Sequence, residues 1–400
     1  MSNNISNNLI SKITKTLDFK HIKKVHHLHE PYIEKNDIKE IQKCINKGFV
    51  SSVGEQILVF KNKIKKFTKS KHVVLTSSGS SALHIILKAL GTNSSNEVLI
   101  PNFNYIASVN AVLMCNSNPH LIDIEEKTLG INVEKLDKYL KQNTYKNSKG
   151  CFNKHSKKKI NSCIALHTYG YSCNIYKLKK VLNKYNIILI EDAAEAIGSF
   201  NKKKHLGTIG YAGVISFNGN KTITTGGGGA ILTSNKKFGD FCSHLSTTAK
   251  VKHKYLFSHD QLGYNYRLPN INAALGVSQM NKIKKILTSK KKLHKKYLQN
   301  FRANKYSDIF DDKKNCESNH WLNILILKEK YFKQKDKLIK NCIKKNIFVR
   351  PGWKLMHVHK YLKKFPRMNL SGSISLYKRL ICMPSSPFYF IKNEKKNFNN

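Results

Sequence analysis

The sequence lacks the cysteine patterns of a metal-binding or disulfide-stabilised protein. Its nine cysteines are odd in number and scattered, and no two of them form a Cys-X-X-Cys pair. A zinc site is therefore poorly supported, and so is a disulfide framework. Reduced thiols in a cytoplasm are the interpretation that this pattern favours.

Long hydrophobic runs are lacking as well. The N-terminal residues contain no continuous apolar stretch of the kind found in secretory signals. The longest apolar runs, such as Ile187–Ile190, are far shorter than a membrane span. The chain is still 40% hydrophobic, which is enough for a folded core. We therefore expect a cytoplasmic protein that does not bind membranes.

Acidic residues and arginine are scarce. The chain has 71 Lys and Arg residues against 24 Asp and Glu, and its formal charge is +47, yet only five of the basic residues are arginine. Nucleic-acid surfaces favour arginine, which grips phosphate and guanine with paired hydrogen bonds. The lysines are spread along the whole chain, and Asn and Ile are abundant as well. Drift of the gene towards A- and T-rich codons produces such a composition. We expect no dedicated nucleic-acid binding, although the positive field attracts anionic substrates.

From about residue 70, short β-rich runs alternate with longer helical patterns, which is typical of a parallel sheet covered by helices. Helices are predicted at Ala82–Leu90 and Ile175–Lys184, where apolar residues recur at helical spacing. The polar stretch Asn143–Lys159 predicts a surface loop. Seven strands are predicted, and they start near His72, Glu97, Pro119, Cys163, Ile187, Ala212 and Gly228.

The pattern changes near residue 270. A Lys-rich amphipathic stretch runs from Asn272 to about Phe301 and leads into a smaller α+β region. A chain of 400 residues suits one large domain and one smaller one. We therefore predict an α/β protein in three parts: an N-terminal segment (1–40), a large α/β domain (41–270) and a small C-terminal α+β domain (271–400).

Polar groups stand at the predicted carboxyl ends of the strands, where open parallel sheets place their ligands. Thr76–Leu83 runs from a strand through Gly into a helix, and the free N–H groups of a helix start attract phosphate. An ordinary Ser N-cap is the alternative. Asp192 ends an apolar strand, where a carboxylate needs a partner such as a pyridinium nitrogen. A helix-capping Asp is the alternative there.

Lys221 follows the strand that ends at Ser216, in a turn that contains Gly. A partly buried lysine near other positive groups supplies a neutral amine, which can form a Schiff base with a carbonyl. In a chain this rich in lysine, a plain surface residue is the alternative. The Ser216 hydroxyl could contribute to a phosphate site. Gly226–Gly229 does not fit a Walker motif and instead predicts a tight turn between two strands.

In this order, the segments resemble the sugar-nucleotide aminotransferases of the DegT/StrS type, which have the fold-type-I architecture of aspartate aminotransferase. The resemblance extends from Leu28–Pro31 to Met383–Ser386, nearly the entire chain. It is greatest to the branch that acts on UDP-linked 4-keto-6-deoxy-N-acetylhexosamines, in routes to bacillosamine and legionaminic acid. The resemblance to the branch rests on SFNGNK with TTGGGG, LHEP (28–31) and GFVSSVG. The segments that carry the resemblance to the family are GFVSSVG (48–54), SSGSSALH (77–84), EDAAEAIGS (191–199), SFNGNKTITTGGGGAI (216–231), TTAK (247–250) and GYNYRLPNINAALG (263–276).

The resemblance implies pyridoxal 5'-phosphate as the cofactor. It implies that Lys221 forms the Schiff base and that Asp192 pairs with the pyridine nitrogen. The backbone amides of Ser80 and Ser81, together with the Ser216 hydroxyl, are then expected to hold the phosphate. Ser80 stands where the family usually has Thr, but its amide is still available for this role.

Three further residues are assigned by the resemblance. Tyr105 is expected to stack on the ring of the cofactor, although Asn104-Tyr105 replaces the usual Thr-aromatic pair. Glu195 is expected near the cofactor edge, at a place often held by Gln or His. Asn265 is expected to reach the phosphate of the other subunit, which implies a homodimer with shared active sites.

The implied activity is transfer of an amino group from an amino acid, with L-glutamate expected, to UDP-2-acetamido-2,6-dideoxy-4-hexulose, giving a 4-amino sugar nucleotide. A pyridoxal-phosphate-dependent sugar dehydratase is an alternative on the same fold, but such enzymes have His where this chain has Lys221. A sugar 3-aminotransferase is a second alternative. A non-catalytic basic binding protein is a third, and the joint presence of Asp192, Ser216 and Lys221 argues against it.

Overall fold

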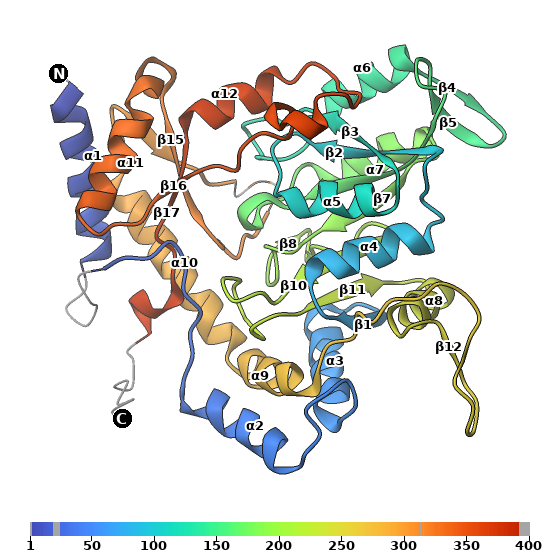
Figure 1. The fold of residues 1–400 in the computed structure, drawn as a ribbon. Helices are drawn as coiled ribbons and strands as arrows, with labels where there is room; N and C mark the ends of the chain where they lie inside the picture. The colour runs from blue at the N-terminus through green and yellow to red at the C-terminus, as the bar shows by residue number, and fades with distance from the viewer. Residues whose placement is uncertain (1, 19–24, 313, 315, 392–400) are drawn as a thin grey trace.

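The computed structural model describes residues 2–18, 25–312, 314 and 316–391. The remaining residues lie outside the description, so the expected segment 1–40 and the expected domain 271–400 are each described in part. Figure 1 shows a large sheet with helices on both sides and a smaller sheet that lies beside it. The three-part division of the chain stays a prediction.

The large sheet contains the seven predicted strands in one continuous path. β11 runs antiparallel to both of its neighbours, β1 and β10, and the other neighbouring pairs on the path are parallel. The predicted α/β class with a mainly parallel sheet is therefore confirmed. In spatial order the strands are β1 (His72–Thr76), β11 (Gly229–Thr233), β10 (Ala212–Ser216), β7 (Ile188–Asp192), β6 (Lys159–Leu166), β2 (Asn96–Pro101) and β3 (Asn118–Ile122).

Both faces of this sheet are buried, which explains why its strands are almost continuously apolar. Within β2, Leu99 packs into the core on one face, whereas Val98 and Ile100 pack into the core on the other. The first core also contains α6 (Val133–Asn143) and α7 (Ile175–Lys184). The second contains α4 (Gly79–Ala89), α5 (Ile106–Met114) and α8 (Lys236–Ser246).

A third apolar core lies beside β1, β10 and β11. It is formed with α3 (Glu55–Thr68) and α9 (Asn270–Asn281), and α2 (Lys35–Asn46) packs on α9. Two short hairpins lie outside the main sheets. They are β8 (Phe200–Asn201) with β9 (Lys204–His205), and β12 (Lys250–Val251) with β13 (Ser258–His259).

The prediction of a surface loop at Asn143–Lys159 is wrong. The stretch forms the hairpin β4 (Thr144–Asn147) and β5 (Gly150–Asn153), and β5 pairs with β6 and so extends the large sheet. Tertiary contacts hold the hairpin in place, because the buried carboxylate of Glu97 accepts hydrogen bonds from Asn153 Nδ2 at 3.0 Å and Ser156 Oγ at 2.5 Å. Such contacts leave no apolar periodicity in the sequence.

The smaller sheet is antiparallel, in the order β14 (Ser307–Ile309), β15 (Asn323–Leu327), β17 (Leu380–Met383) and β16 (Arg350–Pro351). The amphipathic stretch expected at 272–301 forms α9 and then α10 (Ile283–Asn300). The N-terminal helix α1 (Ser2–Leu17) packs on α10 and α11 (Lys335–Lys344) (Figure 1). α12 (Ser371–Arg379) precedes β17.

Five short 3₁₀ helices complete the described elements. None of the helices within the described residues combines the length and the apolar character that crossing a bilayer requires. The five are η1 (Thr168–Gly170), η2 (Glu329–Gln334), η3 (Met356–Val358), η4 (Lys360–Leu362) and η5 (Pro387–Phe390).

Candidate active site

The candidate site lies where two neighbouring parallel strands end. Asp192 is the last residue of β7 and Ser216 the last residue of β10, and the two strands pair with Val214 opposite Asp192. The chain then turns, with the Lys221 amide donating to the Asn218 carbonyl at 3.0 Å. Three of the residues predicted from sequence are therefore brought to one edge of the sheet.

The Lys221 side chain is only 13% exposed. Its Nζ lies 3.4 Å from Glu195 Oε1 and 4.2 Å from the centroid of the Trp321 ring. Trp321 comes from the segment between β14 and β15 of the small sheet, and its Nε1 donates to the Asn220 carbonyl at 2.8 Å. The amine is therefore held between a carboxyl group and an indole face.

Glu195 is 3% exposed and lies just beyond β7. Its Oε2 accepts a hydrogen bond from the Tyr169 amide at 2.8 Å. Tyr169 adopts a left-handed conformation, φ 56°, which is uncommon for a residue other than glycine. Burial raises the pKa of Glu195 to about 7, against the opposing effects of the Lys221 charge and the Tyr169 amide. A neutral acid and a carboxylate are therefore both accessible forms of Glu195 near neutral pH.

Asp192 is buried, and both of its oxygens have protein partners. Oδ2 accepts a hydrogen bond from the Ser108 hydroxyl at 2.8 Å, and Oδ1 accepts one from the Ala194 amide at 3.2 Å. The neighbouring Asn104 is also buried, and its Nδ2 has no partner in the described structure. Sequence analysis missed Ser108, whose only signal is its place in the first turn of the helix after Tyr105.

The sequence suggested two roles for the start of α4, a phosphate site and an ordinary Ser N-cap. Ser78 is the N-cap, and its Oγ accepts a hydrogen bond from the Ser81 amide at 3.0 Å. A phosphate at this helix start would therefore replace or share that cap, while Ser80 lies exposed beside it. Gly79 packs against Ser216, because a Cβ on Gly79 would lie 3.1 Å from Ser216 Cβ. The end of β10 and the start of α4 are thus in contact.

Aromatic side chains line one side of the site. Tyr105 precedes α5 and is mostly exposed, with its ring 6.4 Å from that of Trp353. The Tyr169 ring lies 4.5 Å from Trp353 and 6.1 Å from Trp321. Both tryptophans of the chain are therefore at the site, and sequence analysis assigned neither of them. Their rarity was the only available signal.

Asn265 is exposed, in a segment that runs past the start of α4. It pairs with Thr247, and the carbonyl of the next residue, Tyr266, accepts a hydrogen bond from the Ser77 amide at 2.7 Å. The structure of one chain thus presents the Asn265 side chain outwards, near the helix start of its own site.

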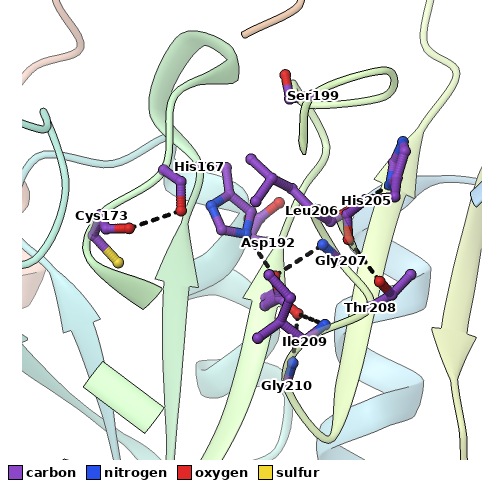
Figure 2. A network of polar contacts seen from close by, with 12 residues as sticks. His167, Cys173, Asp192, Ser199, His205, Leu206, Gly207, Thr208, Ile209 and Gly210 are labelled. Atoms are coloured by element: carbon purple, nitrogen blue, oxygen red, sulfur yellow. Dashed lines mark hydrogen bonds and ion pairs between the residues drawn. The ribbon is translucent and has the colours of Figure 1, made fainter. Parts of the chain in front are cut away.

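A buried network supports the end of β7 from behind. The Glu191 carboxylate accepts hydrogen bonds from His167 Nε2 and from three amides, those of Gly207, Ile209 and Gly210, at 2.6–2.9 Å (Figure 2). Glu191 and His167 are fully buried, and the three amide hydrogen bonds tie the strand end to the loop 205–210. This network fixes the position of the next residue along the chain, the candidate cofactor ligand.

A buried lysine also lies close to the site. Lys290 of α10 donates to the carbonyls of Trp321 at 3.1 Å and Ser385 at 2.6 Å, and burial lowers its pKa well below the usual value. Burial also lowers the pKa of His29, and the charges of Lys290 and Lys221 add to the effect. The abundance of lysine concealed Lys290 from sequence analysis.

These residues fit pyridoxal phosphate. Lys221 offers a partly buried amine for the aldehyde, and Asp192 offers a buried carboxylate for the ring nitrogen. The serine-rich start of α4 and the unpaired Nδ2 of Asn104 suit the oxygen substituents, the phosphate included. Among the described residues, no group of three or more His, Cys, Asp or Glu side chains is arranged to hold a metal ion.

Comparison with known proteins gives a consistent match. Residues 31–392 match the DegT/DnrJ/EryC1/StrS aminotransferase family. The GDP-perosamine synthase of Vibrio cholerae is 32% identical over 363 residues, covering 90% of this chain and 94% of that protein. The UDP-4-amino-4,6-dideoxy-N-acetyl-beta-L-altrosamine transaminase of Campylobacter jejuni is 27% identical over 366 residues, covering 91% and 93%.

Solved structures agree on the fold. The Helicobacter pylori aminotransferase PseC, involved in the biosynthesis of pseudoaminic acid, superposes with a TM-score of 0.81 at 22% identity. The match covers 90% of this chain and 93% of that one.

Proposed function

This chain belongs to the DegT/DnrJ/EryC1/StrS aminotransferase family, and on that premise we propose that it transfers an amino group from an amino acid to a keto sugar carried on a nucleotide. The family depends on pyridoxal phosphate, which supplies an electron-withdrawing ring and carries the amino group between the two substrates. The observation that supports the proposal is the convergence of Lys221, Asp192 and the start of α4 at one sheet edge.

The side chains have distinct proposed roles. Lys221 Nζ binds the cofactor covalently and, once released, moves a proton at the substrate carbon. Asp192, held by Ser108, keeps the ring nitrogen protonated. Glu195 lies at the edge of the ring, close to Lys221. In a chain with His in place of Lys221, dehydration rather than amino transfer would be expected.

The remaining proposed contacts position the cofactor. The amides of Ser80 and Ser81 and the hydroxyl of Ser216 anchor the phosphate, supported by the dipole of α4. Tyr105, which lies at the entrance beside Trp353, stacks on the ring. These contacts orient the cofactor, so that the proton moved by Lys221 is delivered to a fixed face.

We propose UDP-2-acetamido-2,6-dideoxy-4-hexulose as the acceptor and L-glutamate as the donor, with a 4-amino sugar nucleotide as the product. The segments LHEP and GFVSSVG support this branch, and so does the relative from Campylobacter jejuni, whose name includes a UDP-linked amino sugar. A GDP-linked keto sugar is the second candidate, since the relative from Vibrio cholerae is named for GDP-perosamine.

We propose further that the enzyme is a cytoplasmic homodimer with shared sites, in which Asn265 reaches the phosphate of the partner. Exposed hydrophobic residues near the β12–β13 hairpin support a partner surface: Tyr255 is 78% exposed, Phe257 81% and Leu262 73%. The free, buried cysteines are consistent with a reducing compartment.

The test is an absorption spectrum with added pyridoxal phosphate. Wild type should show a protein-bound band at roughly 410–430 nm, and borohydride should abolish the band while fixing the cofactor to Lys221. Lys221→Ala should retain no cofactor covalently. Assays with glutamate and either UDP- or GDP-linked 4-keto sugars then identify the acceptor. The absence of any band in wild type would overturn the assignment and favour a basic binding protein.

A further inference from the structure

We propose that Glu195 and Lys221 share one proton, so that the carboxylate takes up the proton that the Lys221 ammonium must lose before its amine can act as a base. The exchange is balanced within the pair: an ammonium and a carboxylate become an amine and a carboxylic acid, and no other acid or base is required. This inference rests on the proposed function, because that function requires Lys221 as an amine.

The geometry places the two groups in direct contact. Nζ of Lys221 lies 3.4 Å from Oε1 of Glu195, within reach of a proton transfer after a small approach. The other oxygen, Oε2, is occupied by the Tyr169 amide at 2.8 Å. The Glu195 carbonyl also accepts a hydrogen bond from Asn319 Nδ2 at 2.9 Å. Glu195 is therefore fixed at both its backbone and its side chain, with one oxygen facing the amine.

Burial decides against a simple permanent ion pair. The two side chains are 13% and 3% exposed, so both charges of an ion pair would lose most of their hydration. A neutral amine and a neutral acid avoid that cost. The charge of Asp192 favours the acid form of Glu195, whereas the Tyr169 amide and the indole face of Trp321 favour the charged pair. The surroundings of the pair therefore contribute to both forms rather than to one alone.

Other titratable groups around the pair act in both directions. Asp192 approaches from β7, and the phenol of Tyr169 and the thiol of Cys382 are coupled to Glu195 from η1 and β17. The charges of Lys221 and of the buried Lys290 of α10 also act on His29. The pH dependence of the pair must therefore be read from a variant that changes Glu195 alone.

Glu195→Gln is that variant, because Gln keeps the size of the side chain and an oxygen for the Tyr169 amide but cannot take a proton. The full chain, free of cofactor, is exposed briefly to cyanate from about pH 6 to about pH 10. Mass spectrometry then gives the carbamoylation of Lys221 relative to the exposed Lys237, which cancels the reagent's own pH dependence. Glu317→Gln, which changes an exposed carboxyl near Lys291, is the control.

Proton sharing predicts two steps for Lys221 in wild type: partial reactivity from near neutral pH and full reactivity at alkaline pH. Glu195→Gln resembles the pair with a neutral acid and has no anion to hold the ammonium, so it should show a single step near neutral pH and lack the alkaline step. The control should match wild type. A single alkaline step in wild type would instead show an ordinary ion pair and overturn the proposal. The wild-type profile decides the question even if the variant does not fold.

The readout is independent of the proposed activity. The same preparations are incubated with pyridoxal phosphate and treated with borohydride, which reports separately whether Lys221 is the cofactor lysine. A two-step profile without cofactor fixation would retain the proton-sharing pair and reject the function. Fixation with a single-step profile would do the reverse.

Discussion

The Ser108 hydroxyl donates a 2.8 Å hydrogen bond to Oδ2 of Asp192, and both side chains are buried. This bond couples the first turn of α5 to the end of β7. Asp192 is proposed to meet the ring nitrogen of the cofactor. Ser108 therefore orients this carboxylate and occupies one of its oxygens.

Ser108→Ala should weaken cofactor binding by about 10- to 150-fold, because a hydrogen bond to a charged group contributes about 1.5–3 kcal/mol. The measurement is a titration of the protein with pyridoxal phosphate, followed by absorbance. Ser117→Ala is the matched control, since Ser117 is a buried serine that bonds to the Asn96 carbonyl instead. Equal affinities for Ser108→Ala and wild type would show that Asp192 does not need this partner.

The sequence predicted the sheet edge well because chemistry and local structure coincide there. Asp192 and Ser216 each end an apolar strand, and strands read reliably when both faces are buried. Trp321 and Lys290 could not be predicted in the same way. They come from the segment before β15 and from α10, and only the tertiary fold brings the Trp321 ring to Lys221 and the Lys290 amine to the Trp321 carbonyl.

The partner subunit marks a further limit of sequence analysis. The role of Asn265 comes from resemblance alone, since the residue is exposed in the single chain and its own contacts do not reveal a phosphate. The Asn143–Lys159 hairpin was missed for a related reason. Its position depends on the buried Glu97, which lies far from it in the sequence.

Glu191→Gln should destabilise the protein by about 3–5 kcal/mol, the cost of breaking a buried charged network. Burial alone would raise the pKa of Glu191, but the hydrogen bond and charge of His167 and the loop amides outweigh it and lower the pKa. Wild type should therefore keep this contribution above the usual carboxyl range and lose it as pH falls through the lowered value.

Urea unfolding at several pH values measures this effect. Glu134→Gln, at an exposed carboxyl paired with Lys177, should change stability by less than about 1 kcal/mol. If Glu191→Gln behaved like this control, the network in Figure 2 would not be what holds the loop 205–210.

Lys290→Met tests the buried lysine. Burial lowers the pKa of Lys290 in the folded protein, so at pH values between the folded and unfolded pKa the unfolded chain binds more protons. In that range the free energy of unfolding should rise with pH, by up to about 1.4 kcal/mol per unit. The variant lacks this contribution, so the stability of wild type relative to Lys290→Met should increase from neutral to alkaline pH. A difference that stays constant with pH, as expected for the exposed Lys237→Met, would show that Lys290 is not perturbed.

Tyr255→Ser combined with Phe257→Ser should favour the monomer. These side chains are 78% and 81% exposed in the single chain, and their burial against a second copy would be lost. Light scattering over a dilution series measures the change. Tyr361→Ser, at another exposed aromatic, is the control. An unchanged mass at every concentration would place the dimer contact elsewhere.

Shared active sites make a stronger prediction, because each site would take Lys221 from one chain and Asn265 from the other. Lys221→Ala and Asn265→Ala should each be impaired as separate homodimers. After the two variants are mixed under conditions that exchange subunits, every mixed dimer has one site with both changes and one with neither. Random mixing should then restore about a quarter of the wild-type activity. If mixing restores nothing although light scattering shows exchange, Asn265 serves the site of its own chain, next to the Ser77 amide that binds Tyr266.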